Sequence, residues 1–254
     1  MISPADLRSR TQSGAPAPAL VAVAHGSRTP AAQANIRALL DAVRAARPEL
    51  DVREAYIELA APLLPEVLTD VIGDAVVVPL LLGNGYHIAH DVGGVADFHR
   101  PGTPCAPALG PDALLVDALA DRLAEAEFCC PLCPPPTNPV ILAVAGSSDP
   151  RSHADADAVA ALLATRLGRE VVAAYNSSTT PSVVQTVAAL RAAGHAKVSA
   201  ATYLLSPGRF ATEVKACGAD VVSEPLGVHP ALVELVLRRY DVARVAQPRS
   251  TVTT

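Results

Sequence analysis

The sequence predicts an α/β fold made of two tandem domains of one kind, each a parallel sheet flanked by helices. The first observation is an internal repeat, because residues 22–30 return as residues 142–150, and residues 81–87 return as residues 204–210. The second is that short apolar runs alternate with segments whose apolar residues recur at helical spacing, as in parallel sheets covered by helices. A chain of 254 residues with a period near 120 has room for two domains, each with its own core.

The first copy, which we place at residues 19–128, reads as strands separated by helices. Three apolar runs predict strands at residues 20–24, 51–59 and 75–82. Apolar residues at helical spacing predict helices around residues 36–43, at residues 62–71, after Gly85 and at residues 112–126. A proline stands near the first turn of the second of these helices, a position that suits its fixed backbone angle.

Residues 129–139 are rich in Cys and Pro, and this composition can neither continue a helix nor join a central strand. We interpret this segment as an interdomain linker. The second copy, at residues 140–245, then runs in the same order. We expect its strands at residues 140–145, 170–175 and 197–205, and its helices at residues 154–167, 182–193 and 230–240.

Composition excludes several classes of function. The net charge is −5, and with no Trp and three Phe the chain offers neither a basic surface nor stacking platforms for nucleic acid. Its longest apolar run, at residues 75–82, is far shorter than a membrane span. The five cysteines are an odd number, and the first 18 residues do not resemble an export signal. We therefore expect a cytoplasmic protein with reduced thiols, with no nucleic acid and no membrane as partners.

Three residues with reactive side chains stand where predicted strands of the first copy end. They are His25, Glu58 and His87. Ligands bind at the carboxyl ends of strands in open α/β sheets, so we expect the three to converge. Two imidazoles and a carboxylate suit a divalent first-row metal, and the same groups can accept protons near neutral pH. A single His in a loop is more often an ordinary loop residue, but these three are all missing from the second copy, where Ala145, Ser177 and Phe210 replace them.

Two further motifs carry weaker signals. Gly83-Asn84-Gly85 lacks the third glycine of a dinucleotide fingerprint, and no phosphate-loop motif is present, so we expect no nucleotide. His90 and Asp91 follow His87 at helical spacing and could form a local metal site with it, although a place on the rim of the pocket is the simpler interpretation.

The linker also holds a Cys-x-x-Cys motif. Cys129, Cys130 and Cys133 could bind zinc or an iron–sulfur cluster together with Cys105. Three prolines follow the motif directly and the chain has no second copy of it, so an unligated linker is the simpler interpretation.

The separated motifs together resemble one family. His25-Gly26-Ser27-Arg28, residues 56–62 and residues 78–82 leading through Gly85 and His87 to Asp91 are similar to the sirohydrochlorin chelatases, the ATP-independent class II chelatases, in their long two-repeat form. The resemblance covers residues 20–126 well and the second half as a degenerate repeat. The family motif usually continues Asp-Ile-Pro, whereas this chain has Asp91-Val92-Gly93.

This resemblance implies an enzyme whose two domains face each other across a cleft and which inserts Fe²⁺ into sirohydrochlorin to give sirohaem. Metallation removes two pyrrole protons while the metal sheds its water, so the site needs weak bases that also hold and release a metal. His25, His87 and Glu58 are the expected catalytic residues and metal ligands. For the carboxylate-rich substrate we expect contacts from Arg28, Gly85, Arg209 and Phe210, with the arginines binding carboxylates.

Two alternatives remain open. A cobaltochelatase of cobalamin biosynthesis would use the same side chains, because His and Glu accept either ion. A metal- or tetrapyrrole-binding protein without turnover would also fit the loss of the second set. We expect the metal to be a substrate, Fe²⁺ or Co²⁺, and the protein to be a monomer with a pseudo-two-fold repeat.

Overall fold

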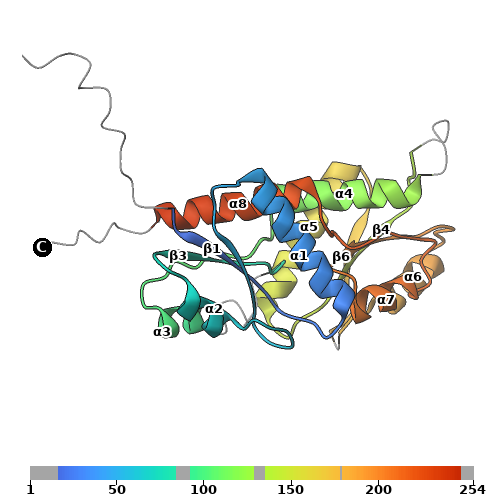
Figure 1. The fold of residues 1–254 in the computed structure, drawn as a ribbon. Coiled ribbons are helices and arrows are strands. Elements are labelled where there is room, and N and C mark those ends of the chain that lie inside the picture. The colour runs from blue at the N-terminus through green and yellow to red at the C-terminus, as the bar shows by residue number, and fades with distance from the viewer. Residues whose placement is uncertain (1–16, 84–91, 129–134, 178, 247–254) are drawn as a thin grey trace, which may run out of the picture.

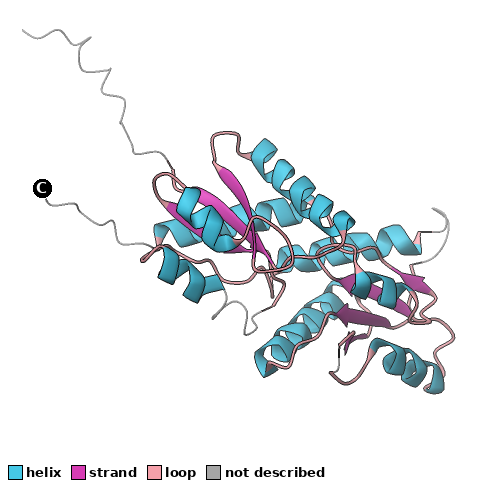
Figure 2. Ribbon diagram, turned by 60° about the horizontal axis from the view of Figure 1, so that its bottom comes forward, coloured by secondary structure: helices cyan, strands magenta, loops and turns pink. Residues whose placement is uncertain are grey.

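The computed structural model describes residues 17–83, 92–128, 135–177 and 179–246. Two parallel sheets dominate it (Figure 2). In the first sheet the strand order is β2-β1-β3, with β1 at Ala19–Ala24, β2 at Val52–Tyr56 and β3 at Ala75–Pro79. In the second sheet the order is β5-β4-β6-β7, with β4 at Val140–Val144, β5 at Val171–Tyr175, β6 at Ser199–Tyr203 and β7 at Val221–Val222. The predicted α/β class, with two parallel sheets flanked by helices, is confirmed.

Eight helices accompany these strands in the described residues. They are α1 (Pro30–Ala46), α2 (Leu64–Asp70), α3 (Val95–His99), α4 (Ala113–Glu127), α5 (Pro150–Leu167), α6 (Val183–Ala192), α7 (Arg209–Lys215) and α8 (Pro230–Val245). α5 begins earlier than predicted because Pro150 occupies its first turn, which a proline favours. The sequence did not predict α7 and β7, since elements this short show no periodicity. A helical segment was expected after Gly85; residues 84–91 lie outside the described ranges, and α3 follows them.

The side chains of β1 alternate between two cores. Leu20, Ala22 and Ala24 face a large apolar core that also contains residues of the second half. The alternate residues Ala19, Val21 and Val23 face a smaller core, formed with α2 and with buried residues near α3. On the second sheet, a third core lies between β4, β6, α6 and α7. Each sheet is therefore covered on both faces, and the inner core is shared by the two halves.

The last helix of each half packs against the other half. α8 lies against α1 and β3, whereas α4 lies against α5 and β6 (Figure 1). The Arg239 side chain of α8 donates hydrogen bonds to the carbonyls of Ala108 and Leu109, at 2.9 Å and 2.8 Å. The Tyr240 hydroxyl of α8 donates to the carbonyl of Pro18, 2.6 Å away. The two halves thus complete each other's cores, although the sequence limits at residues 128 and 140 remain a prediction.

None of the helices within the described ranges is both long and apolar enough to cross a bilayer.

Candidate functional site

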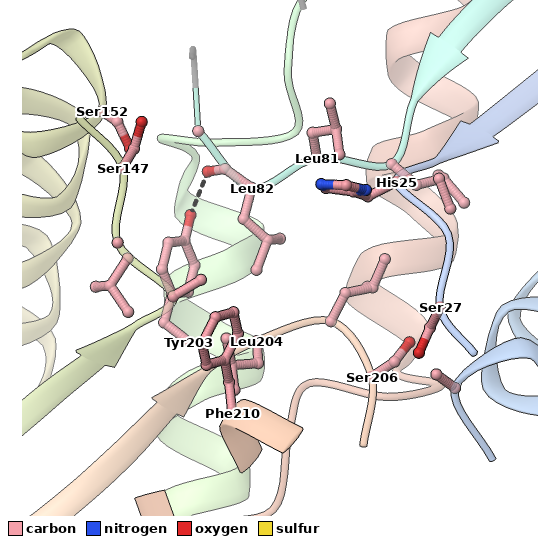
Figure 3. A pocket seen from close by; sticks show the side chains of 18 of the residues that line it. His25, Ser27, Leu81, Leu82, Ser147, Ser152, Tyr203, Leu204, Ser206 and Phe210 are labelled. Atoms are coloured by element: carbon pink, nitrogen blue, oxygen red, sulfur yellow. Dashed lines mark hydrogen bonds between the residues drawn. The ribbon is translucent and has the colours of Figure 1, made fainter. Parts of the chain in front are cut away.

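A cavity of about 500 Å³ lies between the two halves, at the carboxyl ends of the strands (Figure 3). Its wall is formed by the segments that follow four strands and by the first turns of α1 and α5. The segments after the strands are residues 24–27, 80–83, 144–148 and 203–206. This is where an open parallel sheet binds ligands, because the loops there converge.

His25 and Glu58 meet at the edge of this cavity. The parallel ladder between β1 and β2 continues past both strand ends, since the Ile57 amide donates to Ala24 and the Glu58 amide donates to His25 at 3.0 Å. This places His25 Nδ1 3.6 Å from Glu58 Oε1, with the two side chains 44% and 56% exposed. His25 lines the cavity. Nδ1 itself is buried, so the exposure of His25 belongs to the rest of its side chain. The pair is close enough to share a proton, and the exposed part of the imidazole is open to a ligand.

Gly26 explains why the two loops can approach so closely. Its φ of +103° lies in the left-handed region, and a Cβ atom added there would stand 1.7 Å from the carbonyl oxygen of Glu58. No other residue type fits this position without moving the Glu58 backbone. The glycine after His25 is therefore a structural requirement of the His25–Glu58 pair.

The second half keeps the loop geometry without the reactive side chains. Gly146 has a φ of +93°, and an added Cβ would stand 2.1 Å from the hydroxyl of Ser177, the residue that replaces Glu58. In the first half the Gln33 side chain donates to the Ser27 carbonyl at 2.8 Å. His153 contacts the Ser147 carbonyl at 2.7 Å in the same way. The repeat thus preserves the backbone of the loop but not the reactive side chains.

The predicted substrate contacts lie at different places. Phe210 lines the cavity wall. Arg209 is 77% exposed, stands 3.7 Å from Glu213 and lies over the Phe210 ring at 4.7 Å. Arg28 is exposed, just after the His25 loop. Neither arginine lines the cavity, whose described wall contains Asp155 but no Arg or Lys. If Arg28 and Arg209 contact the substrate, they do so outside the described cavity wall, at its rim.

Several predicted residues lie outside the described ranges. They are Gly85, His87, His90, Asp91, Cys129, Cys130 and Cys133. Among the residues that are described, no group of three His, Cys, Asp or Glu side chains is arranged to hold a metal. Cys105 is described and half-buried, and its burial raises the pKa of the thiol to about 11, which disfavours the thiolate.

Tyr203 is a cavity residue that sequence reasoning missed. It ends β6 in the second half, and its hydroxyl donates to the carbonyl of Leu82 in the first half, 2.8 Å away (Figure 3). Burial raises the pKa of this hydroxyl well above its ordinary value, so it remains a donor at neutral pH. In the sequence it resembles any aromatic residue of a buried strand, and no local pattern reveals its partner.

Solved structures of known proteins share this fold. SirB from Bacillus subtilis with Fe³⁺ superimposes with a TM-score of 0.75 at 23% identity, covering 89% of this chain and 95% of SirB. SirB from the subspecies spizizenii in complex with cobalt gives a TM-score of 0.72, also at 23% identity and with the same coverage. At this level of identity the two structures show the fold.

Sequence comparison supplies the family. A curated relative from Methanosarcina acetivorans, a sirohydrochlorin cobaltochelatase, is 26% identical over 123 residues, in an alignment that covers 42% of this chain and 95% of the relative. The sequence model of the CbiX family matches this chain twice, at residues 19–126 and again at residues 139–243. Both halves, including the one without the reactive residues, are thus recognisable copies of one unit, and the chain belongs to the CbiX family.

Proposed function

We propose that this protein is a sirohydrochlorin chelatase, an enzyme that inserts a divalent metal ion into the macrocycle without ATP. The observation that carries the proposal is the His25–Glu58 pair, 3.6 Å apart, at the edge of a cavity built by both halves. The related proteins named above are a sirohydrochlorin cobaltochelatase and SirB, the sirohydrochlorin chelatase. The pair supplies the groups that such a reaction requires.

The chemistry follows from what the macrocycle loses and gains. Two pyrrole nitrogens release their protons, and four nitrogens bind the metal ion. An imidazole accepts protons near neutral pH and binds first-row metals without the tight hold of a thiolate. In the proposal His25, Glu58 and His87 bind the incoming ion. As the ion passes to the ring nitrogens, the freed His25 imidazole accepts one of the two pyrrole protons and the Glu58 carboxylate accepts the other. The exposed parts of the His25 and Glu58 side chains let the ion lose water stepwise and the protons leave.

The wall of the cavity suits a large, flat ring with a polar edge. Apolar residues such as Leu81, Leu82 and Phe210 alternate with hydroxyls of Ser27 and Ser206. In the proposal the ring packs on these apolar side chains. Its carboxylates reach the rim, where Arg28 and Arg209 can bind them, and Gly85 lets the backbone approach the ring.

For the metal we propose Fe²⁺, with sirohaem as the product. Cobalt is the second candidate, because the Methanosarcina relative is a cobaltochelatase and one SirB structure holds cobalt. Both ions suit imidazole and carboxylate ligands. An anaerobic assay with sirohydrochlorin and the two ions in competition decides between them. The absorbance change on insertion measures the rate for each.

The same assay tests the site. We expect His25→Ala to remove most of the insertion activity and to leave the fold intact, because His25 is partly exposed on a loop. His153→Ala is the matched control, since this imidazole belongs to the corresponding region of the second half and does not line the described cavity wall. Equal activity in both variants would refute the site. Tight binding of sirohydrochlorin by the wild-type protein, without any turnover, would instead favour a carrier.

A further inference from the structure

One hydrogen bond joins the wall of the first half directly to the second half. The Tyr203 hydroxyl of β6 donates to the Leu82 carbonyl at 2.8 Å. Tyr203 is only 3% exposed, and both residues line the cavity together with His25 (Figure 3). Leu82 is half-buried, so loss of this donor would release its carbonyl from the second half.

We propose that Tyr203 is a positioning residue, supplied by the second half, that holds residues 80–83 of the cavity wall in register with His25. The inference rests on the proposed function and deepens it. It assigns the second half a part in positioning the cavity wall of the first, in addition to any contact with the substrate.

Hydrogen bonds fix the wall segment, residues 80–83, at three successive residues. The Leu80 amide donates to Val23 at 2.8 Å, which extends the pairing of β3 with β1. The Leu81 carbonyl accepts from the Leu109 amide at 2.8 Å, within the same half. The Leu82 carbonyl accepts from the Tyr203 hydroxyl, which belongs to the other half. The segment is thus fixed relative to His25 at one end and relative to the second half at the other.

Gly110 shows how closely this contact is built. A Cβ atom added to Gly110 would stand 2.3 Å from the Leu82 carbonyl oxygen and 2.4 Å from the Tyr203 hydroxyl oxygen. The absence of a side chain at residue 110 therefore leaves just enough room for the hydrogen bond. Tyr203 and Leu82 have little freedom to move while the bond is made.

The repeat provides a counterpart in the opposite direction. Leu205, which corresponds to Leu82, has its carbonyl bound by the Gly227 amide of its own half at 3.0 Å and by the Asn35 side chain of α1 at 3.2 Å. Asn35 also donates to the Ser206 hydroxyl at 2.9 Å. Each half therefore holds the strand-end loop of the other, but only the loop held by Tyr203 belongs to the half with the His25–Glu58 pair.

The position of this wall matters because metal transfer requires the ring nitrogens to face the bound ion at a defined distance. Misplacement of a reactant by about 1 Å can cost up to about 100-fold in rate. Substrate affinity, in contrast, is spread over the whole cavity. Loss of the Tyr203 hydrogen bond should thus reduce kcat more than it raises KM.

The test compares Tyr203→Phe with Asn35→Ala in the full-length protein. We expect Tyr203→Phe to lower kcat for metal insertion about tenfold, the effect of one hydrogen bond, with KM for sirohydrochlorin changed less than about twofold. We expect Asn35→Ala to retain the wild-type kcat, because it frees the loop of the half without the pair. Thermal unfolding of both variants verifies that they fold.

Each other outcome overturns the inference. An unchanged kcat in Tyr203→Phe would show that the hydrogen bond does not position the wall. An equal loss of kcat in both variants would indicate a general weakening of the contact between the halves, and a rise in KM alone would indicate substrate binding. A wild-type protein without insertion activity would refute the proposed function, and the inference with it.

Discussion

Removing the charge of Glu127 tests whether the packing of α4 against the second half holds the two halves together. Glu127 ends α4, and its carboxylate accepts two hydrogen bonds of 2.8 Å from the guanidinium of Arg169 in the second half. The side chains of Arg169 and Glu127 are only 5% and 9% exposed. The Ser199 hydroxyl adds a third hydrogen bond to the carboxylate, at 2.5 Å. We expect Glu127→Gln to leave the guanidinium buried without a counter-charge.

The size of the effect follows from this burial. Breaking a buried ion pair by removing one partner typically costs about 3–5 kcal/mol, because the remaining charge has lost its solvation. Glu127→Gln keeps the shape and one acceptor, so we expect about 3 kcal/mol. For a chain of this length that corresponds to a fall in Tm of roughly 6–12 °C. The measurement is urea unfolding followed by circular dichroism, with Tm from a thermal scan.

A second ion pair between α4 and the second half is the matched control. Asp117 of α4 and Arg166 of α5 stand 3.2 Å apart, but their side chains are about half exposed, at 49% and 53%. Exposed pairs contribute about 0–1 kcal/mol, so Asp117→Asn should lower Tm by less than about 4 °C. If Glu127→Gln cost no more than Asp117→Asn, the buried pair would not be what joins α4 to the second half.

Three further changes test other parts of the structure. Gly26→Ala should destabilise the fold by more than about 2 kcal/mol and abolish insertion, whereas Gly102→Ala, with a positive φ but open space around it, should cost about 1 kcal/mol in urea unfolding. The hydrogen bond from Arg47 lowers the pKa of Asp241, so this pair stabilises the fold above the unfolded pKa. The Tm difference between Asp241→Asn and wild type should therefore shrink as the pH falls below about 4. Arg209→Ala should raise KM for sirohydrochlorin while sparing kcat, and added salt should reduce the difference; a salt-independent loss of kcat would contradict a rim contact.

The sequence alone was sufficient for the fold class, because the signals for it are local. Residues 20–24 and 140–144 are apolar runs of strand length, and both lead into a Gly-Ser turn followed by a helix. The same reasoning brought His25 and Glu58 together, since parallel strands align their carboxyl ends. The structure places the two side chains 3.6 Å apart, as neighbours on adjacent strand ends.

The partners of α4 and α8 were decided only by tertiary structure. The apolar face of α4, with Leu115 and Leu119, indicates that the helix is buried, but periodicity does not indicate against which sheet. For the same reason Tyr203 could not be paired with Leu82, 121 positions away in the chain. A contact between the halves depends on how the two folded halves pack against each other, and no single segment of the sequence carries this information. α8 of the second half packs against α1 and β3 of the first. A fragment that ends at residue 128 would therefore expose the apolar face of the first half that α8 covers.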